Sequence, residues 1–590
     1  MQVTLGRWSL DELIKDPKSI DKELDKIEKQ VKELENKKSI LRNDISIDEF
    51  KDIIKRFEDL YEQLSKISGY VHLWYYSDLR SNQAAALVSK VERIIADISN
   101  RLLFFNLWFK KELDEENANR LINGMDKQYR DYLRHKRLLA KYTLSEKEEK
   151  IINILEVTGS HALVKVYDKI TDTFEFIVSI KKDGKIIKRR FKNKEKMLTL
   201  VRSTKPEERE GAYKALLTTY GKNSMVLGEI YSNIATKWYD EYVKLRGYNS
   251  PISVRNVSNN IDDTTVDTLL KVCRVNANIF QDYFRIKAKL LDVKRLRRYD
   301  IYAPLKAQKK FSYEQAVKLV LDAFNEFDHR FRKYAEDIFK KKHVDSELRE
   351  GKRSGAFCYT VTPKILPYVL LNFDGTSRGV STIAHEFGHA MHSIISSDKS
   401  ILVHDAPLPL AETASVFAEM LLNDRLERIV SKKDRISLLV EEIDDMYATI
   451  LRQSYFTLFE IDAHNKIIDN ATIDDVSKIY LNNLREQFGN SIRLSDDFKY
   501  EWLYIPHFYH TPFYCYAYAF GNLLALSLYQ EYKSGNKGFN EKYFSILNAG
   551  GSRKPESLLL EHGFDISKEE FWNKGFELIR SKIDELKALA

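Results

Sequence analysis

The chain has 590 residues, more than one hydrophobic core normally organises, so we expect two or three sub-domains or one large two-lobed helical body. Its 95 basic and 87 acidic side chains leave a formal net charge of +8, a slight excess that is typical of a solvated protein without a nucleic-acid partner. No segment has the roughly 18 uncharged residues that a membrane span needs, and residues 1–7 do not form a basic and apolar leader, so we expect a cytoplasmic protein with no membrane partner.

Two amphipathic helices are predicted first along the chain. Apolar residues recur three or four positions apart between residues 20 and 34, and again between residues 53 and 64. Because the repeat is short, we interpret the pair as an αα-hairpin packed on itself and not as a dimerisation coil. Residues 70–160 continue as long, aromatic-rich helical patterns, which we expect in the core.

A β-hairpin gives the clearest strand signal. Two strand-like segments, 174–180 and 185–191, flank Asp183 and Gly184, a dipeptide typical of a two-residue hairpin turn. The basic runs at 188–190 and 294–298 lie among acidic or apolar residues without a companion motif, so we interpret both as hydrated surface. Helical patterning resumes near Lys194, and with only 22 Gly and 11 Pro we expect a mainly α architecture with small β inserts.

A metal-binding motif follows in the second half of the chain. Residues 385–389 are His-Glu-Phe-Gly-His in a segment of helical composition. Side chains four apart share one helix face, so His385 and His389 can bind one metal ion, with Glu386 beside them as the catalytic base. We therefore predict a peptidase with one Zn²⁺ per chain. Three cysteines, far apart and odd in number, argue against a disulfide framework and against thiolate ligands: Cys273, Cys358 and Cys515.

Catalytic zinc needs a third protein ligand and an open position for water. A metzincin site is excluded, because position 395 is Ile where that class needs His. Residues 408–419 predict a second helix, and we assign the third ligand to Glu412 on it. Glu419, two turns further, could take that role or hold a ligating imidazole by a hydrogen bond. We interpret His392 as a packing residue, since a fourth ligand would close the site to water.

The strand-like segment 367–373 lies just upstream of the motif and has two interpretations. As a strand edge beside the zinc, it would hold an extended peptide by main-chain hydrogen bonds. As a buried strand, it would have a structural role alone.

Four blocks together resemble the thimet oligopeptidase family of metallopeptidases and, within it, the oligoendopeptidase F group: 351–357, 384–393, 412–415 and 505–521. The resemblance implies an all-helical, two-lobed gluzincin body with a deep channel around the zinc. It also implies internal cleavage of oligopeptides and not of folded proteins. We accordingly divide the chain into an N-terminal helical hairpin region (1–110), a helical segment with the small β-hairpin (111–200) and a catalytic domain with the zinc site (201–590).

The segment 505–518 is dense in His and Tyr, which are suitable donors to an oxyanion. The family has transition-state-stabilising His and Tyr residues in the corresponding block. Two histidines can match the family's histidine and three tyrosines can match its tyrosines. All five remain candidates for stabilising the oxyanion: His507, His510, Tyr514, Tyr516 and Tyr518.

The predicted reaction is hydrolysis of internal bonds in short, unstructured peptides. Zinc lowers the pKa of water from about 15.7 towards 7, and Glu386 takes the proton and passes it to the leaving amine. A zinc carboxypeptidase or dipeptidase on a similar helical body is the alternative, although no single Arg can be identified as the group that grips a substrate carboxylate. A non-catalytic helical scaffold is a third interpretation, against which the intact Glu386 argues.

Overall fold

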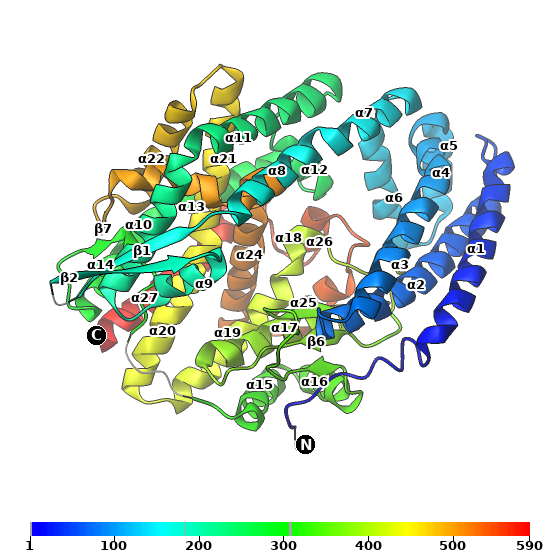
Figure 1. Ribbon diagram of the computed structural model, residues 1–590. Coiled ribbons are helices and arrows are strands. Elements are labelled where there is room, and N and C mark those ends of the chain that lie inside the picture. The colour runs from blue at the N-terminus through cyan, green and yellow to red at the C-terminus, as the bar shows by residue number, and fades with distance from the viewer. Residues whose placement is uncertain (1–2, 183, 306–309) are drawn as a thin grey trace. The chain divides into compact units, whose positions relative to one another are not determined.

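The computed structural model describes residues 3–182, 184–305 and 310–590, and helices make up most of this part of the chain (Figure 1). The strands are short and few, so the prediction of a mainly α fold with small β inserts is confirmed. None of the described helices is long and apolar enough to cross a membrane. Asp183, predicted in the hairpin turn, lies outside the described residues.

The chain folds into two compact units, each assembled from three separate stretches. Unit 1 comprises Met1–Thr143, Lys309–Ile429 and Glu531–Phe564, and unit 2 comprises Leu144–Gln308, Val430–Gln530 and Asp565–Ala590. The chain therefore alternates between the two units.

Unit 1 begins with the predicted helical hairpin. α1 (Ile20–Asn36) packs against α2 (Ile47–Ser77), which starts at a capping box formed by Ser46 and Glu49. Its other α-helices are α3 (Asn82–Arg101), α4 (Leu103–Leu107), α5 (Glu115–Gly124), α6 (Lys127–Ala140), α15 (Tyr313–Phe327), α16 (His329–Lys340), α17 (Ser377–Ile395), α18 (Leu408–Ala411), α19 (Thr413–Ile429), α25 (Phe539–Asn548) and α26 (Pro555–Glu561).

A three-stranded sheet also belongs to unit 1. Its spatial order is β4 (Val344–Asp345), β6 (Tyr368–Leu370), β5 (Phe357–Tyr359), with β6 parallel to β4 and antiparallel to β5. All three residues of β6 are fully buried, whereas those of β5 are half-buried. The inner strand is therefore β6, and β5 forms an edge.

Unit 2 contains the predicted β-hairpin, formed by β1 (Phe176–Lys182) and β2 (Lys185–Phe191) in antiparallel register, and a short parallel pair, β3 (Leu296–Arg297) and β7 (Ile492–Arg493). Its α-helices are α7 (Glu146–Thr158), α8 (Ser160–Asp172), α9 (Lys194–Leu198), α10 (Pro206–Lys222), α11 (Ser224–Trp238), α12 (Ser253–Ser258), α13 (Asp263–Val275), α14 (Ala277–Leu290), α20 (Lys432–Met446), α21 (Arg452–Ile468), α22 (Ile473–Phe488), α23 (Pro506–His510), α24 (Tyr516–Lys533) and α27 (Glu569–Leu589).

Candidate metal centre

The metal-binding motif lies on α17 in unit 1, and α19 packs directly against it (Figure 1). Gly388 makes this close approach possible. A Cβ added there would lie 2.5 Å from the carbonyl oxygen of Ala414 and 2.5 Å from the Cα of Ser415. The two helix backbones are therefore nearly in contact, and this places Glu412, at the junction of α18 and α19, opposite the two histidines.

Gly388→Ala is expected to weaken metal binding by at least about ten-fold, because the added methyl group must push α19 and Glu412 away from α17. The thermal midpoint of the metal-free protein should also fall. Gly6→Ala is the matched control, since its added methyl group meets no atom closer than 3.9 Å. A metal titration of both variants measures the effect. Unchanged affinity in Gly388→Ala would mean that the helix contact does not position Glu412.

Three donor atoms converge in front of α17. Nε2 of His385 lies 3.2 Å from Nε2 of His389, and each lies 3.5 Å from Oε2 of Glu412. Donors about 2.0–2.1 Å from a tetrahedral Zn²⁺ are separated by about 3.3 Å, so these three distances match three corners of a zinc site. In the described part of the chain, these residues form the one cluster of three or more potential ligands.

Hydrogen bonds fix the orientation of these ligands. His385 donates from Nδ1 to Oε1 of Glu419 at 2.5 Å, so Nε2 is the ring nitrogen that faces the cluster and would bind a metal ion in place of its proton. Ser415 Oγ donates to Oε2 of Glu412 at 2.7 Å. Of the two roles that the sequence left open for Glu419, the geometry therefore supports the imidazole-holding one.

The electrostatics of the cluster favour a cation. Burial disfavours the charged form of His385, but the carboxylates of Glu419, Glu412 and Glu386 outweigh it and raise the pKa of this imidazole to about 9. Burial also raises the pKa of Glu412, yet His389 and His385 together reverse the shift and hold it below its usual value. The carboxylates therefore favour positive charge at the imidazoles, and a divalent ion would meet the same field.

Glu386 lines a cavity of about 440 Å³ that also reaches His385, His389 and His392. Burial raises the pKa of the Glu386 carboxyl to about 7, although neighbouring His385 and the backbone N–H of Cys358 oppose the shift. The side chains of His385 and His389 are 29% and 26% exposed, so both ligands are accessible from the cavity that they line. His392 is buried, and burial lowers its pKa to about 3, which makes it a neutral packing residue of the cavity wall.

The edge strand beside the cluster is β5 and not the predicted segment 367–373. That segment contains β6, which pairs on both sides and is buried, so it has the structural role. β5 contributes Phe357 and Cys358 to the cavity wall, and its backbone contacts Glu386. The edge-strand interpretation of 367–373 was wrong because a strand's own composition does not determine its place in a sheet.

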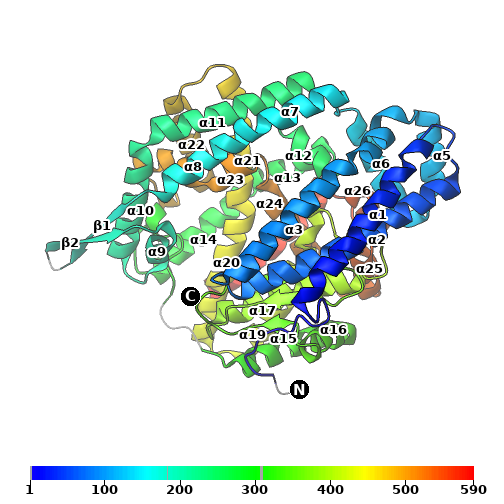
Figure 2. The same ribbon diagram turned by 45° about the vertical axis from the view of Figure 1, so that its right-hand side comes forward.

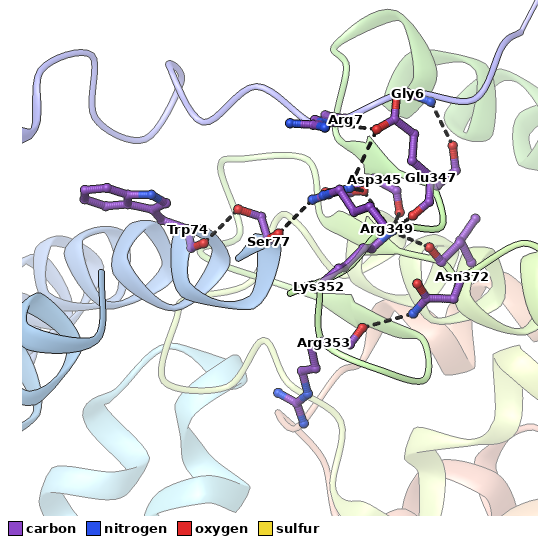
Figure 3. A network of polar contacts seen from close by, with 12 residues as sticks. Gly6, Arg7, Trp74, Ser77, Asp345, Glu347, Arg349, Lys352, Arg353 and Asn372 are labelled. Atoms are coloured by element: carbon purple, nitrogen blue, oxygen red, sulfur yellow. Dashed lines mark hydrogen bonds and ion pairs between the residues drawn. The ribbon is translucent and has the colours of Figure 1, made fainter. Parts of the chain in front are cut away.

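A polar network holds the segment that leads into β5 (Figure 3). Buried Lys352 lies 2.8 Å from Oδ1 of Asp345 and donates to the carbonyls of Glu347 and Leu371 at 2.9 and 2.6 Å. Arg349 also pairs with Asp345 at 2.6 Å. Because the buried donors of Lys352 and Arg349 all meet acceptors, they bind the segment 346–356 to the sheet. This segment leads into β5 and so fixes the position of β5 beside Glu386.

The His and Tyr candidates lie in unit 2, and the structure brings three of them together. The rings of His507, Tyr514 and Tyr518 have centroids 5.3–6.0 Å apart and line a cavity of about 280 Å³, with His510 at its wall. Burial lowers the pKa of His507, so its ring is neutral near pH 7. Tyr516 lies elsewhere: it is fully buried, and its hydroxyl accepts a hydrogen bond from Asn259. Their action on an oxyanion stays a prediction.

A buried carboxyl group that the sequence did not single out holds this segment. Glu460 on α21 is fully buried, and its Oε1 accepts a hydrogen bond at 2.8 Å from the backbone N–H of Phe513. Phe513 has a φ of +57°, in the left-handed region that a bulky residue rarely adopts. The carboxyl group therefore stabilises a strained turn directly before Tyr514. No motif marks Glu460, because its spacing on the helix is that of an ordinary core position.

Glu460→Gln is expected to remove a pH-dependent loss of stability. Burial raises the pKa of Glu460 from an ordinary value of about 4.5 to about 8. The folded state then binds more protons than the unfolded state between these values, so the free energy of unfolding falls as the pH rises through this window. The amide of Gln can still accept the Phe513 hydrogen bond but does not titrate.

Chemical denaturation at pH 5, 6.5 and 8 measures the difference. The denaturation midpoint of Glu460→Gln should rise relative to the unmodified protein as the pH increases, while Glu577→Gln, at an exposed position of α27, should leave the pH dependence unchanged. Parallel pH profiles for the Glu460 variant and the unmodified protein would contradict the raised pKa.

Comparisons with known proteins show which family the chain resembles along most of its length. The model of peptidase family M3 matches residues 199–578, and that of the oligopeptidase F N-terminal region matches residues 111–176. An oligoendopeptidase F homolog of Borreliella burgdorferi is 29% identical over 92% of this chain and 91% of its own. A homolog of Lactococcus lactis is 26% identical over 91% of this chain and 89% of its own.

Solved structures extend the likeness to the fold. The crystal structure of a Chlamydophila abortus protein described as a peptidase matches this chain with a TM-score of 0.87 at 26% identity. The match covers 99% of this chain and 98% of that protein. The oligoendopeptidase F of Enterococcus faecium has a TM-score of 0.70 at 20% identity, with 97% of this chain and 99% of its own covered. At that identity the second likeness concerns the fold alone.

Proposed function

Because this chain belongs to peptidase family M3 and is a metallopeptidase, we propose that it is a zinc-dependent oligoendopeptidase that cleaves internal bonds of short, unstructured peptides. The observation that carries the proposal is the triangle of donor atoms on His385, His389 and Glu412, with sides of 3.2, 3.5 and 3.5 Å, next to the carboxyl group of Glu386. One ion per chain fits this donor set, and its two nitrogens and one oxygen suit zinc.

The residues of the site have separable roles. A bound zinc ion would act as a Lewis acid and make a water molecule acidic near neutral pH. Glu386 takes a proton from the attacking water and later gives it to the leaving amine. Burial raises the pKa of its carboxyl above the usual value, which favours the return of the proton to the amine. Glu419 keeps His385 in the tautomer that leaves Nε2 free to bind the metal.

The edge of β5 is proposed to bind the substrate backbone. Cys358 N–H reaches Glu386, so an extended peptide paired with this edge would pass directly over the catalytic base. Main-chain hydrogen bonds of this kind recognise an extended backbone more than particular side chains. The donors for the oxyanion are proposed to include His507 together with Tyr514 or Tyr518. Substitution of each tyrosine by Phe distinguishes between the two.

A peptide blocked at both ends tests the reaction class. An acetylated and amidated substrate should be cleaved internally by the zinc-loaded enzyme, and mass spectrometry should give two products. A carboxypeptidase or dipeptidase needs a free terminus and would leave it intact. A non-catalytic scaffold would leave a diverse peptide library unchanged.

A second comparison tests size selection, which the family resemblance predicts. Peptides derived from casein should be cut much faster per bond than unfolded casein itself, because a site enclosed by helical walls admits short chains. Equal rates per bond would mean that long chains reach the site freely, and the proposal of an enclosed channel would have to be abandoned.

A further inference from the structure

Almost all of the formal charge excess of the chain lies in and beside the β1–β2 hairpin. Residues 181–196 include nine Lys or Arg and two acidic residues, a net charge of +7, whereas the whole chain has +8. The sequence alone favoured a hydrated surface for the run at 188–190. The strand register now shows which of these side chains share a face.

The outer face of the hairpin combines cations with exposed isoleucines. Cross-strand pairing places Ile177 opposite Arg190, Ser179 opposite Lys188, and Lys181 opposite Ile186. These six side chains point to one face, because alternate residues of a strand share a side. All six are exposed, and the two isoleucines keep 58% and 67% of their surface in solvent.

The opposite face fixes the hairpin to unit 2. Phe176, Val178 and Ile180 are buried on that side, and β1 packs on α10. Gly211 of α10 allows the closest approach, since an added Cβ would lie 2.8 Å from the carbonyl oxygen of Ser179. In Figure 2 the hairpin extends to one side of α9 and α10. The outer face is therefore held in a fixed orientation.

The charges of the outer face are largely uncompensated. Arg190 pairs with Glu175, while Lys181 and Lys188 have no carboxylate partner among the described residues. On the inner side, Arg189 lies 3.8 Å from Glu208. Two strands of seven residues span about 23 Å, enough to contact several lipid headgroups at once.

We propose that this outer face, formed by residues 177, 179, 181, 186, 188 and 190, attaches the enzyme reversibly to bilayers that contain anionic lipids. Lys181 and Lys188 would contact the acidic headgroups, and Ile177 and Ile186 would enter the boundary between headgroups and acyl chains. The positive charge of the face is complementary to the negative headgroups. The exposed isoleucines add an apolar contribution to lipid binding that a merely hydrated surface lacks. With few charges and no inserted helix, the attachment is weak and sensitive to salt.

A nucleic acid fits this face less well. Single strands are bound by aromatic side chains on which bases stack, together with a positively charged groove. The outer face has no aromatic residue, and its two isoleucines would be dehydrated against phosphates without gain. The lipid surface therefore accounts for both the charged and the apolar members of the face.

Vesicle flotation with the full, zinc-loaded protein tests the proposal. The protein should float with vesicles of equal parts phosphatidylcholine and phosphatidylglycerol in about 0.1 M salt, but not with phosphatidylcholine alone, and about 0.5 M salt should release it. The double variant Lys181→Gln/Lys188→Gln should partition about 30-fold more weakly, since each lysine near an anionic surface contributes about five-fold. Ile177→Ser/Ile186→Ser should also weaken binding, by about ten-fold or more.

The matched control is Lys22→Gln/Lys29→Gln, which removes two exposed lysines of α1 and so the same charge. Control and unmodified protein should partition alike, and all variants should cleave a soluble peptide at the same rate. Absence of binding to the mixed vesicles, or equal loss in the control, would overturn the proposal. Tighter binding of a single-stranded RNA that depends on Lys181 and Lys188, without vesicle binding, would assign the face to nucleic acid instead.

Discussion

Glu386→Gln is expected to lower turnover by about two to three orders of magnitude or more while the metal content stays at one ion per chain. Gln has nearly the same shape and keeps its contact with the Cys358 N–H, but it can neither take a proton from water nor return it to the amine. Because only proton transfer is removed, the loss should appear in kcat and much less in KM.

Metal analysis beside steady-state kinetics checks this expectation. Glu314→Gln, at an exposed position in the first turn of α15, serves as the matched carboxylate control and should retain full activity. Near-normal turnover of the Glu386 variant would remove this residue from the role of base and leave the site without an identified proton carrier.

Glu412→Ala is expected to release the metal at concentrations that saturate the unmodified protein. Glu412 supplies the one carboxylate oxygen of the donor triangle, 3.5 Å from both imidazole nitrogens, and its loss leaves two protein ligands where catalytic zinc needs three. Activity should be lost with the metal. Dialysis against a weak chelator followed by elemental analysis measures occupancy.

Glu419→Ala separates a ligand from a group that orients one. Glu419 contacts Nδ1 of His385 and none of the three donor atoms, so its loss should weaken metal affinity by about 10- to 100-fold without emptying the site. An empty site in Glu419→Ala together with an occupied one in Glu412→Ala would mean that the two assignments are reversed.

The local part of the site was predictable because helix geometry determines it. His385, Glu386 and His389 lie within about one helical turn, so their spacing alone predicts that the two imidazoles share a face. The helical hairpin of residues 20–64 and the β1–β2 hairpin were predictable for the same reason, since contacts near in sequence depend on periodicity and turn chemistry.

Features that depend on distant contacts were not predictable in the same way. Whether the segment 367–373 is an edge or an inner strand depends on β4 and β5, which pair with it from other parts of the chain. Tyr516 and Tyr518 are two positions apart and equally aromatic, yet one is buried against Asn259 and the other lines a cavity. Glu460 gave no signal, because its partner, the Phe513 N–H, is 53 residues away.

The alternation of the chain between two units also sets the order in which the metal site can form during synthesis. α17 and α19 emerge from the ribosome well before Glu531–Phe564, the last stretch of unit 1. That stretch supports them: the ring of Tyr543 on α25 stacks on Phe417 with centroids 4.4 Å apart, and its hydroxyl donates a hydrogen bond to the carbonyl of Thr413, the residue after Glu412. A nascent chain that ends before this stretch therefore holds all three ligands and the α17–α19 contact at Gly388, but it lacks the contacts of Tyr543 with Phe417 and Thr413. The support of the metal site is therefore completed only when residues 531–564 have been made, near the end of synthesis.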